Sequence, residues 1–204
     1  MSRKIARIDL FPNPLFVVSD LLGDDQRFQL QKDCYRWRDS SPGQVITNSG
    51  GWHSENTLFT RDEDSFKTLS RAVIQKVIII AKSIDKSIEG TKGLKIKTEG
   101  WVNINKGNDF NAPHDHSGYT FSGCYYVKVP EKILSDVKSA GHIQFLDPCM
   151  GSNPNDIKIF KKMKFGYYQP KEDTLLVFPS WLKHMVHPHR EQEDRISIAF
   201  NVRF

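Results

Sequence analysis

The sequence has few cysteines and no long hydrophobic run, and each shortage argues against a class of protein. Its three cysteines, Cys34, Cys124 and Cys149, are an odd number without CxxC spacing. They disfavour a disulfide framework, and we expect a reducing, cytoplasmic compartment. No uninterrupted apolar run approaches the roughly 18 residues of a membrane span, because Gln75 and Lys76 interrupt the most hydrophobic segment. We therefore expect no membrane partner.

Signals for export and for several domains are also missing. Asp9, Pro12 and Pro14 divide the apolar residues near the N-terminus, so no continuous signal-peptide core is expected. We find no internal repeat, low-complexity tract or linker within the 204 residues, a length typical of one domain. We predict a single domain over residues 1–204.

The charge balance raises the question of nucleic acid. The net charge is +5 and the isoelectric point is about 9.0. A basic stretch contains Lys158, Lys161, Lys162 and Lys164 and is followed by Tyr167. Lysines at such irregular spacing are typical of a solvated face, so nucleic acid is not the expected partner.

Two segments of the N-terminal half have helical patterns. Residues 24–38 place apolar side chains among polar ones and end before Ser40-Ser41-Pro42, which predicts a helix. Residues 63–87 repeat apolar residues at steps of three and four, namely Phe66, Leu69, Val73, Val77, Ile80 and Ile84. We interpret this stripe as core packing, and residues 1–92 as a helical support for the remainder.

From Leu94 onward the pattern changes to short β-rich runs, at 94–105, 120–129, 141–146, 174–178 and 195–203. Turn formers separate these runs and no helix of useful length intervenes, which favours an antiparallel sandwich or jelly roll over a parallel sheet. The predicted fold class is mainly β with N-terminal helices. Residues 93–204 form its jelly-roll core.

Two groups of histidines indicate a metal site. His114 and His116 lie two residues apart, so in an extended segment both imidazoles point to one side while Asp115 faces elsewhere. A third ligand must come from a distant strand, and His184 follows the apolar run that ends at Phe178. Such ligands suit Fe, Zn, Cu or Ni, and ligand softness alone does not choose among them.

Other histidines carry weaker signals. His187 lies close to His184 and competes with it as a ligand, although its neighbours Pro188 and His189 favour a loop. We interpret His53 and His142 as structural. Cys124 lies in an apolar strand beside Tyr125 and is expected to fill the core.

The C-terminal run contains a candidate carboxylate clamp. Residues 195–203 alternate strictly, so Arg195, Ser197 and Asn201 share one face of the predicted strand. A planar guanidinium binds a carboxylate through two parallel hydrogen bonds, and the serine hydroxyl supplies a third donor. A similar alternation places Trp101, Asn103 and Asn105 on one face of an earlier strand, which could line a pocket.

Six motifs together resemble one family, the 2-oxoglutarate and iron(II) oxygenases related to prolyl hydroxylases. The similarity extends over nearly the whole chain. The motifs are Leu10-Phe-Pro, Ser49-Gly-Gly-Trp-His-Ser, Pro113-His-Asp-His, Ser122-Gly-Cys-Tyr-Tyr-Val, Phe178-Pro-Ser-Trp-Leu-Lys-His and Arg195-Ile-Ser-Ile-Ala-Phe-Asn. The resemblance implies a double-stranded β-helix of the cupin-like kind.

The resemblance also implies roles for individual residues. His114 and His184 look like iron ligands, favouring His184 over His187, and Arg195 like the partner of the distal 2-oxoglutarate carboxylate. Ser197 looks like the helper of Arg195, and Tyr126 matches a tyrosine that contacts the cosubstrate in prolyl-hydroxylase-like enzymes.

One position departs from the family pattern. The wider superfamily uses His-x-Asp, and here His116 stands in place of the carboxylate. Either three histidines bind the ion, or two histidines bind it and water completes the site.

The implied activity is that of a non-haem dioxygenase with Fe(II), 2-oxoglutarate and O2. Its substrate is an unidentified small molecule or peptide side chain, and a homodimer is left open. Two alternatives remain, a cupin-type metal isomerase or lyase without a carboxylate clamp, and a non-catalytic binding module on the same fold. The substrate is expected to be read by loops at 147–170 and around Gly50-Gly51.

Overall fold

The computed structural model describes residues 13–90, 95–134, 140–146 and 166–204 of the chain. The helices are α1 (Asp24–Ser40), α2 (Asp64–Ile84) and the short 3-10 helices η1 (Leu58–Thr60), η2 (Lys86–Gly90) and η3 (Glu131–Leu134). Both long helices occur where the sequence predicts them, and α2 ends slightly before the predicted residue 87. Among the described residues, no helix has the length and apolar character needed to cross a bilayer.

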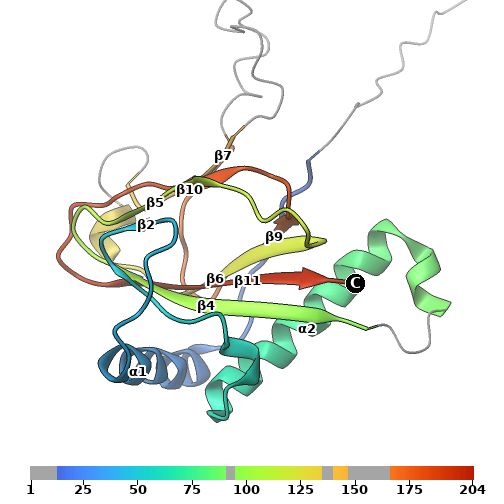
Figure 1. Ribbon diagram of the computed structural model, residues 1–204, viewed down its shortest axis with the longest axis horizontal. Coiled ribbons are helices and arrows are strands. Elements are labelled where there is room, and N and C mark those ends of the chain that lie inside the picture. Colours follow the sequence, from blue (N-terminus) through green and yellow to red (C-terminus); the bar gives the residue numbers. More distant parts are fainter. Residues whose placement is uncertain (1–12, 91–94, 135–139, 147–165) are drawn as a thin grey trace, which may run out of the picture.

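The strands pair antiparallel in two sheets that face one another (Figure 1). One sheet has the order β1-β9-β6-β11-β4-β3 and the other β2-β5-β10-β7-β8. The strands are β1 (Phe16–Val18), β2 (Asn48–Ser49), β3 (Trp52–His53), β4 (Lys97–Asn105), β5 (Phe110–His114), β6 (Phe121–Lys128), β7 (Ile143–Phe145), β8 (Gly166–Tyr168), β9 (Leu175–Pro179), β10 (His184–Val186) and β11 (Arg195–Arg203). The predicted jelly roll with N-terminal helices is confirmed.

The two helices cover the outer face of the six-stranded sheet (Figure 1). From Phe66 to Ile80 the apolar stripe of α2 is buried there, as predicted, and packs with the outward side chains of the central strands. Its last member, Ile84, ends the helix and is exposed, contrary to the prediction that it packs in the core. These include Val102, Tyr125, Val127, Val177, Ile196, Ile198 and Phe200. Each large apolar side chain buried in this way stabilises the fold by about 1.5–3 kcal/mol, so this layer fixes the sheet that carries the site.

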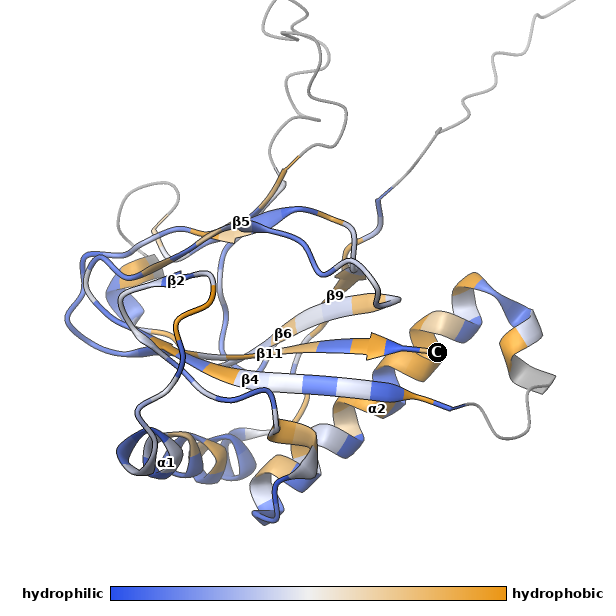
Figure 2. Cartoon of the chain, viewed as in Figure 1, coloured by the Kyte–Doolittle hydropathy of each residue, from blue (hydrophilic) through white to orange (hydrophobic). Residues whose placement is uncertain are grey.

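The opposite face of the same strands looks into the space between the sheets. Hydrophobic and polar residues alternate along β4 and β11 (Figure 2), because successive side chains of a strand point to opposite faces. On β11, Ile196 and Ile198 pack toward the helices, which leaves Arg195 and Ser197 facing the other sheet. The face assigned to Arg195, Ser197 and Asn201 from the alternation is thus the inner one.

A carboxylate on the turn before β9 holds the start of α1. Asp173 accepts hydrogen bonds from the backbone N–H groups of Leu22 and Gly23 and from the hydroxyl of Tyr125. Its charge lies at the N-terminus of α1, where the helix dipole favours an anion. This contact joins the start of α1 to β6 and β9 of the six-stranded sheet.

Several expectations fall on residues outside the described ranges. They are Leu10-Phe-Pro, the basic stretch at Lys158–Lys164, Cys149 and most of the proposed substrate loop at 147–170. The described cysteines, Cys34 and Cys124, are free thiols in the core.

Candidate metal centre

Three histidines meet between the sheets on neighbouring strands. His114 ends β5 and pairs directly with His184, the first residue of β10. His116 lies just beyond β5, where its backbone N–H donates to the carbonyl of Ser180 at 2.9 Å. One ligand atom from each of the three rings lies within 4.8 Å of the other two. The structure therefore brings together all three histidines named from the sequence.

Backbone carbonyls orient two of the three rings. Nδ1 of His114 lies 2.7 Å from the carbonyl oxygen of Ala112, and Nδ1 of His184 lies 2.9 Å from that of Leu182. A carbonyl accepts only, so each Nδ1 carries the proton and donates it, which leaves Nε2 with a free lone pair. This is the usual outer contact of a metal-binding histidine.

Burial keeps two of these rings neutral. Desolvation, followed by the effect of His114, lowers the pKa of His184 to about 3 and that of His116 to about 4. The charge of Glu99 acts on the pKa of His116 in the opposite direction but does not outweigh burial. Since a metal binds the deprotonated imidazole, both rings are ready to bind an ion at neutral pH.

The remaining histidines lie outside this group. His187 contacts the side-chain oxygen of Gln144 through Nε2 at 2.7 Å, so His184 is the member of the pair that joins the cluster. His53 is buried and stacks on Trp101, with ring centroids 5.5 Å apart. Its structural role is as expected, but it also lines a cavity beside the metal centre.

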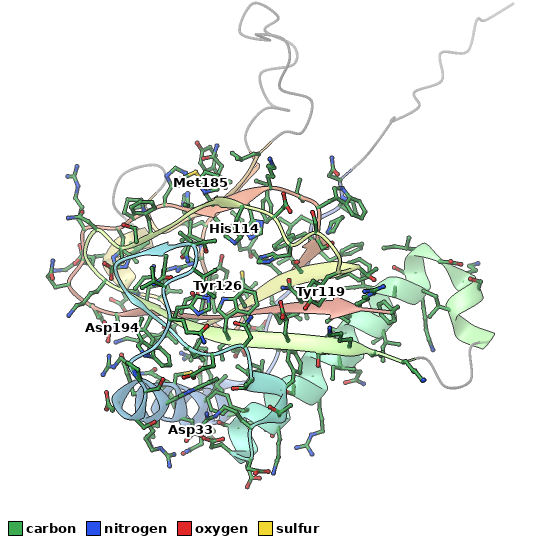
Figure 3. The ribbon with its side chains drawn as sticks, viewed as in Figure 1. Asp33, His114, Tyr119, Tyr126, Met185 and Asp194 are labelled. Carbon is green, nitrogen blue, oxygen red and sulfur yellow. The ribbon has the colours of Figure 1, made fainter. Side chains whose placement is uncertain are left out.

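A buried arginine lies on the facing sheet. Arg195 is 2% exposed, and its Nε and Nη1 atoms have no hydrogen-bond partner among the described residues. Its guanidinium carbon lies 5.4 Å from the ring centroid of Tyr126, and Ser197 pairs with Tyr126 across β11 and β6. Figure 3 shows Tyr126 and His114 in the space between the two sheets.

The hydroxyl of Tyr126 is a further unused donor. It is buried and, within the described ranges, has no hydrogen-bond partner. Burial raises the pKa of Tyr126 well above its ordinary value, so the hydroxyl keeps its proton and can donate it. Cys124 lies on the same inner face, and burial raises the pKa of its thiol to about 11, as expected for a core residue.

These donors line one cavity of about 50 Å³, which the three histidines of the cluster also line. Its polar lining includes Asn103, Tyr126, Arg195 and Ser197, and Phe178 and Ile143 contribute apolar walls. An unpaired cation in such a place is costly, because burial removes its hydration without supplying a counter-charge. The arrangement therefore fits an anionic ligand that reaches from Arg195 toward the histidines.

A second cavity, of about 220 Å³, lies on the other side of the histidines. His114, His116 and Trp101 line both cavities, whereas Glu99 and Asp115 line only the second. The sequence analysis did not single out Glu99. The alternation that placed Trp101 and Asn103 on one strand face extends back to Glu99 and would have found it.

Comparison with known proteins gives one family. Residues 99–201 match the family described as "Putative 2OG-Fe(II) oxygenase". The matched segment covers half of the chain and includes the three histidines, Tyr126, Arg195 and Ser197. No curated protein matches the sequence significantly.

Solved structures share the fold at low identity. A prolyl-4-hydroxylase from Pseudomonas putida is 14% identical with a TM-score of 0.67, over 94% of this chain and 92% of that one. A viral collagen prolyl hydroxylase from Paramecium Bursaria Chlorella virus-1, in a 2OG complex, is 13% identical with a TM-score of 0.56, over 92% and 94%. HygX from Streptomyces hygroscopicus, with nickel and 2-oxoglutarate bound, is 9% identical with a TM-score of 0.58, over 93% and 82%.

Proposed function

This chain belongs to the family of 2-oxoglutarate and iron(II) oxygenases, and we propose that it hydroxylates a C–H bond of a small molecule or a peptide side chain. The observation that carries the proposal is the buried guanidinium of Arg195, whose Nε and Nη1 have no partner within the described part of the chain, in the same cavity as three histidines. A metal site alone does not explain a buried arginine, because the arginine adds positive charge beside the ion. A dicarboxylate cosubstrate would supply the missing anion.

His114, His116 and His184 would hold the iron. Their nitrogen atoms suit Fe(II), although the same donors accept other divalent transition metals. The proximity of all three ligand atoms favours a three-histidine site over two histidines and a water. Since three neutral imidazoles bring no negative charge, the proposed site would carry one negative charge fewer than a site with His-x-Asp.

Arg195, Ser197 and Tyr126 would bind the distal carboxylate of 2-oxoglutarate. The guanidinium offers two parallel N–H groups for a bidentate contact, and the two hydroxyls can add further donors. All three come from β6 and β11, which the helical layer holds rigid. Because the cavity measures about 50 Å³, we expect some lining side chains to change rotamer when the cosubstrate enters.

When bound, iron and 2-oxoglutarate supply the activation of O2, with one oxygen atom inserted into the substrate C–H bond and the other retained in succinate as CO2 is released. The chain's own part is to position these groups and to exclude water. Phe178 and Ile143 form apolar walls, and the Nδ1 contacts of His114 and His184 hold the ligand rings in one orientation.

Turnover without substrate tests the proposal. Wild-type protein with Fe(II), 2-oxoglutarate and O2 should release succinate slowly, and His184→Ala and Arg195→Met should abolish this release. His187→Ala, which changes a histidine outside the cluster, serves as the matched control and should retain it. Metal binding by the wild type without any 2-oxoglutarate binding would instead support a cupin-type isomerase or lyase.

A further inference from the structure

The second cavity has an anionic wall next to the metal centre. Glu99 and Asp115 contribute carboxylates, Trp101 and His53 contribute aromatic faces, and Ile46 lies at the cavity with 57% of its surface exposed. His116 and His114 line both this space and the inner cavity. A volume of about 220 Å³ is smaller than the pockets of drug-sized ligands, so it suits a side chain or a small molecule.

A buried chain of hydrogen bonds holds Glu99. The hydroxyl of Ser122 donates to Oδ1 of Asn201 at 2.7 Å, and Nδ2 of Asn201 donates to Glu99 at 2.7 Å. An ionised carboxylate only accepts, so the amide group of Asn201 must present its nitrogen to Glu99 and its oxygen to Ser122. Ser122 and Asn201 are each 1% exposed, which makes the chain rigid.

A tyrosine contributes to the same network. Burial, followed by a hydrogen bond with Glu99, raises the pKa of Tyr119 to about 12. Figure 3 shows Tyr119 toward the C-terminal end of β11, the end at which Asn201 and Glu99 pair. The carboxylate is thus held by the amide of Asn201, interacts with the phenol of Tyr119, and still has acceptor capacity left.

Glu99 has no cationic partner of its own in the part of the chain that the structure describes. Among the described residues, neither Glu99 nor Asp115 forms an ion pair. Lys97 and Arg203 lie one step further along the same strand faces, but both are exposed to solvent. An oriented anion beside a tryptophan face provides the two elements that recognise an organic cation, a counter-charge and a π surface.

We propose that this outer cavity binds a positively charged group of the substrate, an ammonium or a guanidinium, with Glu99 as its counter-ion and Trp101 as its aromatic wall. The inference rests on the proposed function, because it takes the histidine cluster as the reacting centre. It names the substrate class as an amine-bearing small molecule or a basic peptide side chain. The shared histidines would then place a C–H bond near the cation at the metal.

Binding of matched probes tests the inference. Protein loaded with redox-inert Ni(II) is titrated calorimetrically, with and without 2-oxoglutarate. The cationic probes are Nα-acetyl N-methylamides of lysine, ornithine and arginine, and the norleucine derivative is the uncharged isostere of lysine. At least one cationic probe should bind about tenfold more tightly than norleucine, which corresponds to about 1.4 kcal/mol.

Variants test whether the carboxylate of Glu99 causes the tighter binding of cationic probes. Glu99→Gln keeps an acceptor for Asn201 but removes the charge, and it should reduce the preference to within about twofold. Glu131→Gln makes the same change on exposed η3, beyond the opposite end of β6, and should leave the preference intact. The same titration of the wild type at high salt needs no variant. In about 1 M NaCl, where the Debye length is about 3 Å, the preference for the cationic probe over norleucine should weaken.

Two outcomes would overturn the inference. One is equal or stronger binding of norleucine relative to every cationic probe, and the other is an unchanged preference in folded Glu99→Gln. The proposed function is judged separately, by 2-oxoglutarate binding in the same titrations. A cation preference without 2-oxoglutarate binding would reject the proposed function alone.

Discussion

Replacing Arg195 by methionine should stabilise the protein without cosubstrate and abolish its response to 2-oxoglutarate. Methionine replaces the apolar stem of the arginine with an unbranched side chain that has no charge, so it removes the buried cation. The buried guanidinium of the wild type lowers the stability of the cosubstrate-free protein, because its anion site is used only when a carboxylate is bound. Functional sites commonly carry such a cost in stability.

The magnitude follows from the contacts of the guanidinium. Two donor nitrogens of Arg195, Nε and Nη1, lack partners among the described residues, and the two together cost about 2–6 kcal/mol at the scale of buried unsatisfied groups. The contact with the ring of Tyr126 returns about 1 kcal/mol. Arg195→Met should therefore raise the free energy of unfolding by about 1–5 kcal/mol, and the melting temperature by roughly 2–20 °C.

Thermal unfolding with and without 2-oxoglutarate measures both effects. At about 100 times its Kd, 2-oxoglutarate should stabilise the Ni(II)-loaded wild type by about 2.7 kcal/mol and leave Arg195→Met unchanged. Arg203→Met removes an exposed arginine from the same strand and should change stability by less than about 0.5 kcal/mol. A destabilised Arg195→Met that still responds to 2-oxoglutarate would refute the reasoning.

Three further predictions concern the cluster and the core. His184→Ala should lose metal binding measured by calorimetry, whereas His187→Ala should bind normally; equal losses would contradict the assignment. The pKa values of His184 and His116, about 3 and about 4, lie below the ordinary 6.5. At a pH between these values and 6.5, the unfolded chain therefore binds more protons than the folded protein. The metal-free protein should thus lose stability as pH falls from about 6.5 toward about 4, and urea midpoints that stay constant between pH about 7 and about 5 would refute this. Gly123→Ala would bring its Cβ against the backbone carbonyl of Leu176 and should lower the unfolding free energy by roughly 1–3 kcal/mol, and an unchanged melting temperature would exclude the clash.

The sequence predicted those parts of the site that depend on periodicity. Strict alternation from Arg195 onward placed Arg195 and Ser197 on one face of the strand, because a paired central strand must obey the period of two, and the structure shows that this face is the inner one. The apolar residues at steps of three and four in 63–87 identified the buried face of α2, because they follow the period of a helix. The two-residue spacing brought His114 and His116 together, even though β5 ends at His114.

Sequence periodicity could not predict the short and irregular strands. Pro113 lies inside β5 and would ordinarily argue against a strand, and β10 spans only His184–Val186. Their pairing, which sets His114 opposite His184, depends on the whole sandwich. The hydrogen-bond chain from Ser122 to Glu99 joins strands far apart in sequence, so no local pattern could link these residues to one another.

The most direct test of the central claim is anaerobic titration of Fe(II)-loaded protein with 2-oxoglutarate, followed by visible absorption. Bidentate binding to Fe(II) should produce a charge-transfer band that saturates in wild type and is absent, at the concentration that saturates wild type, in both His184→Ala and Arg195→Met. If wild-type protein holds Fe(II) but shows neither the band nor any binding of 2-oxoglutarate, the account is contradicted.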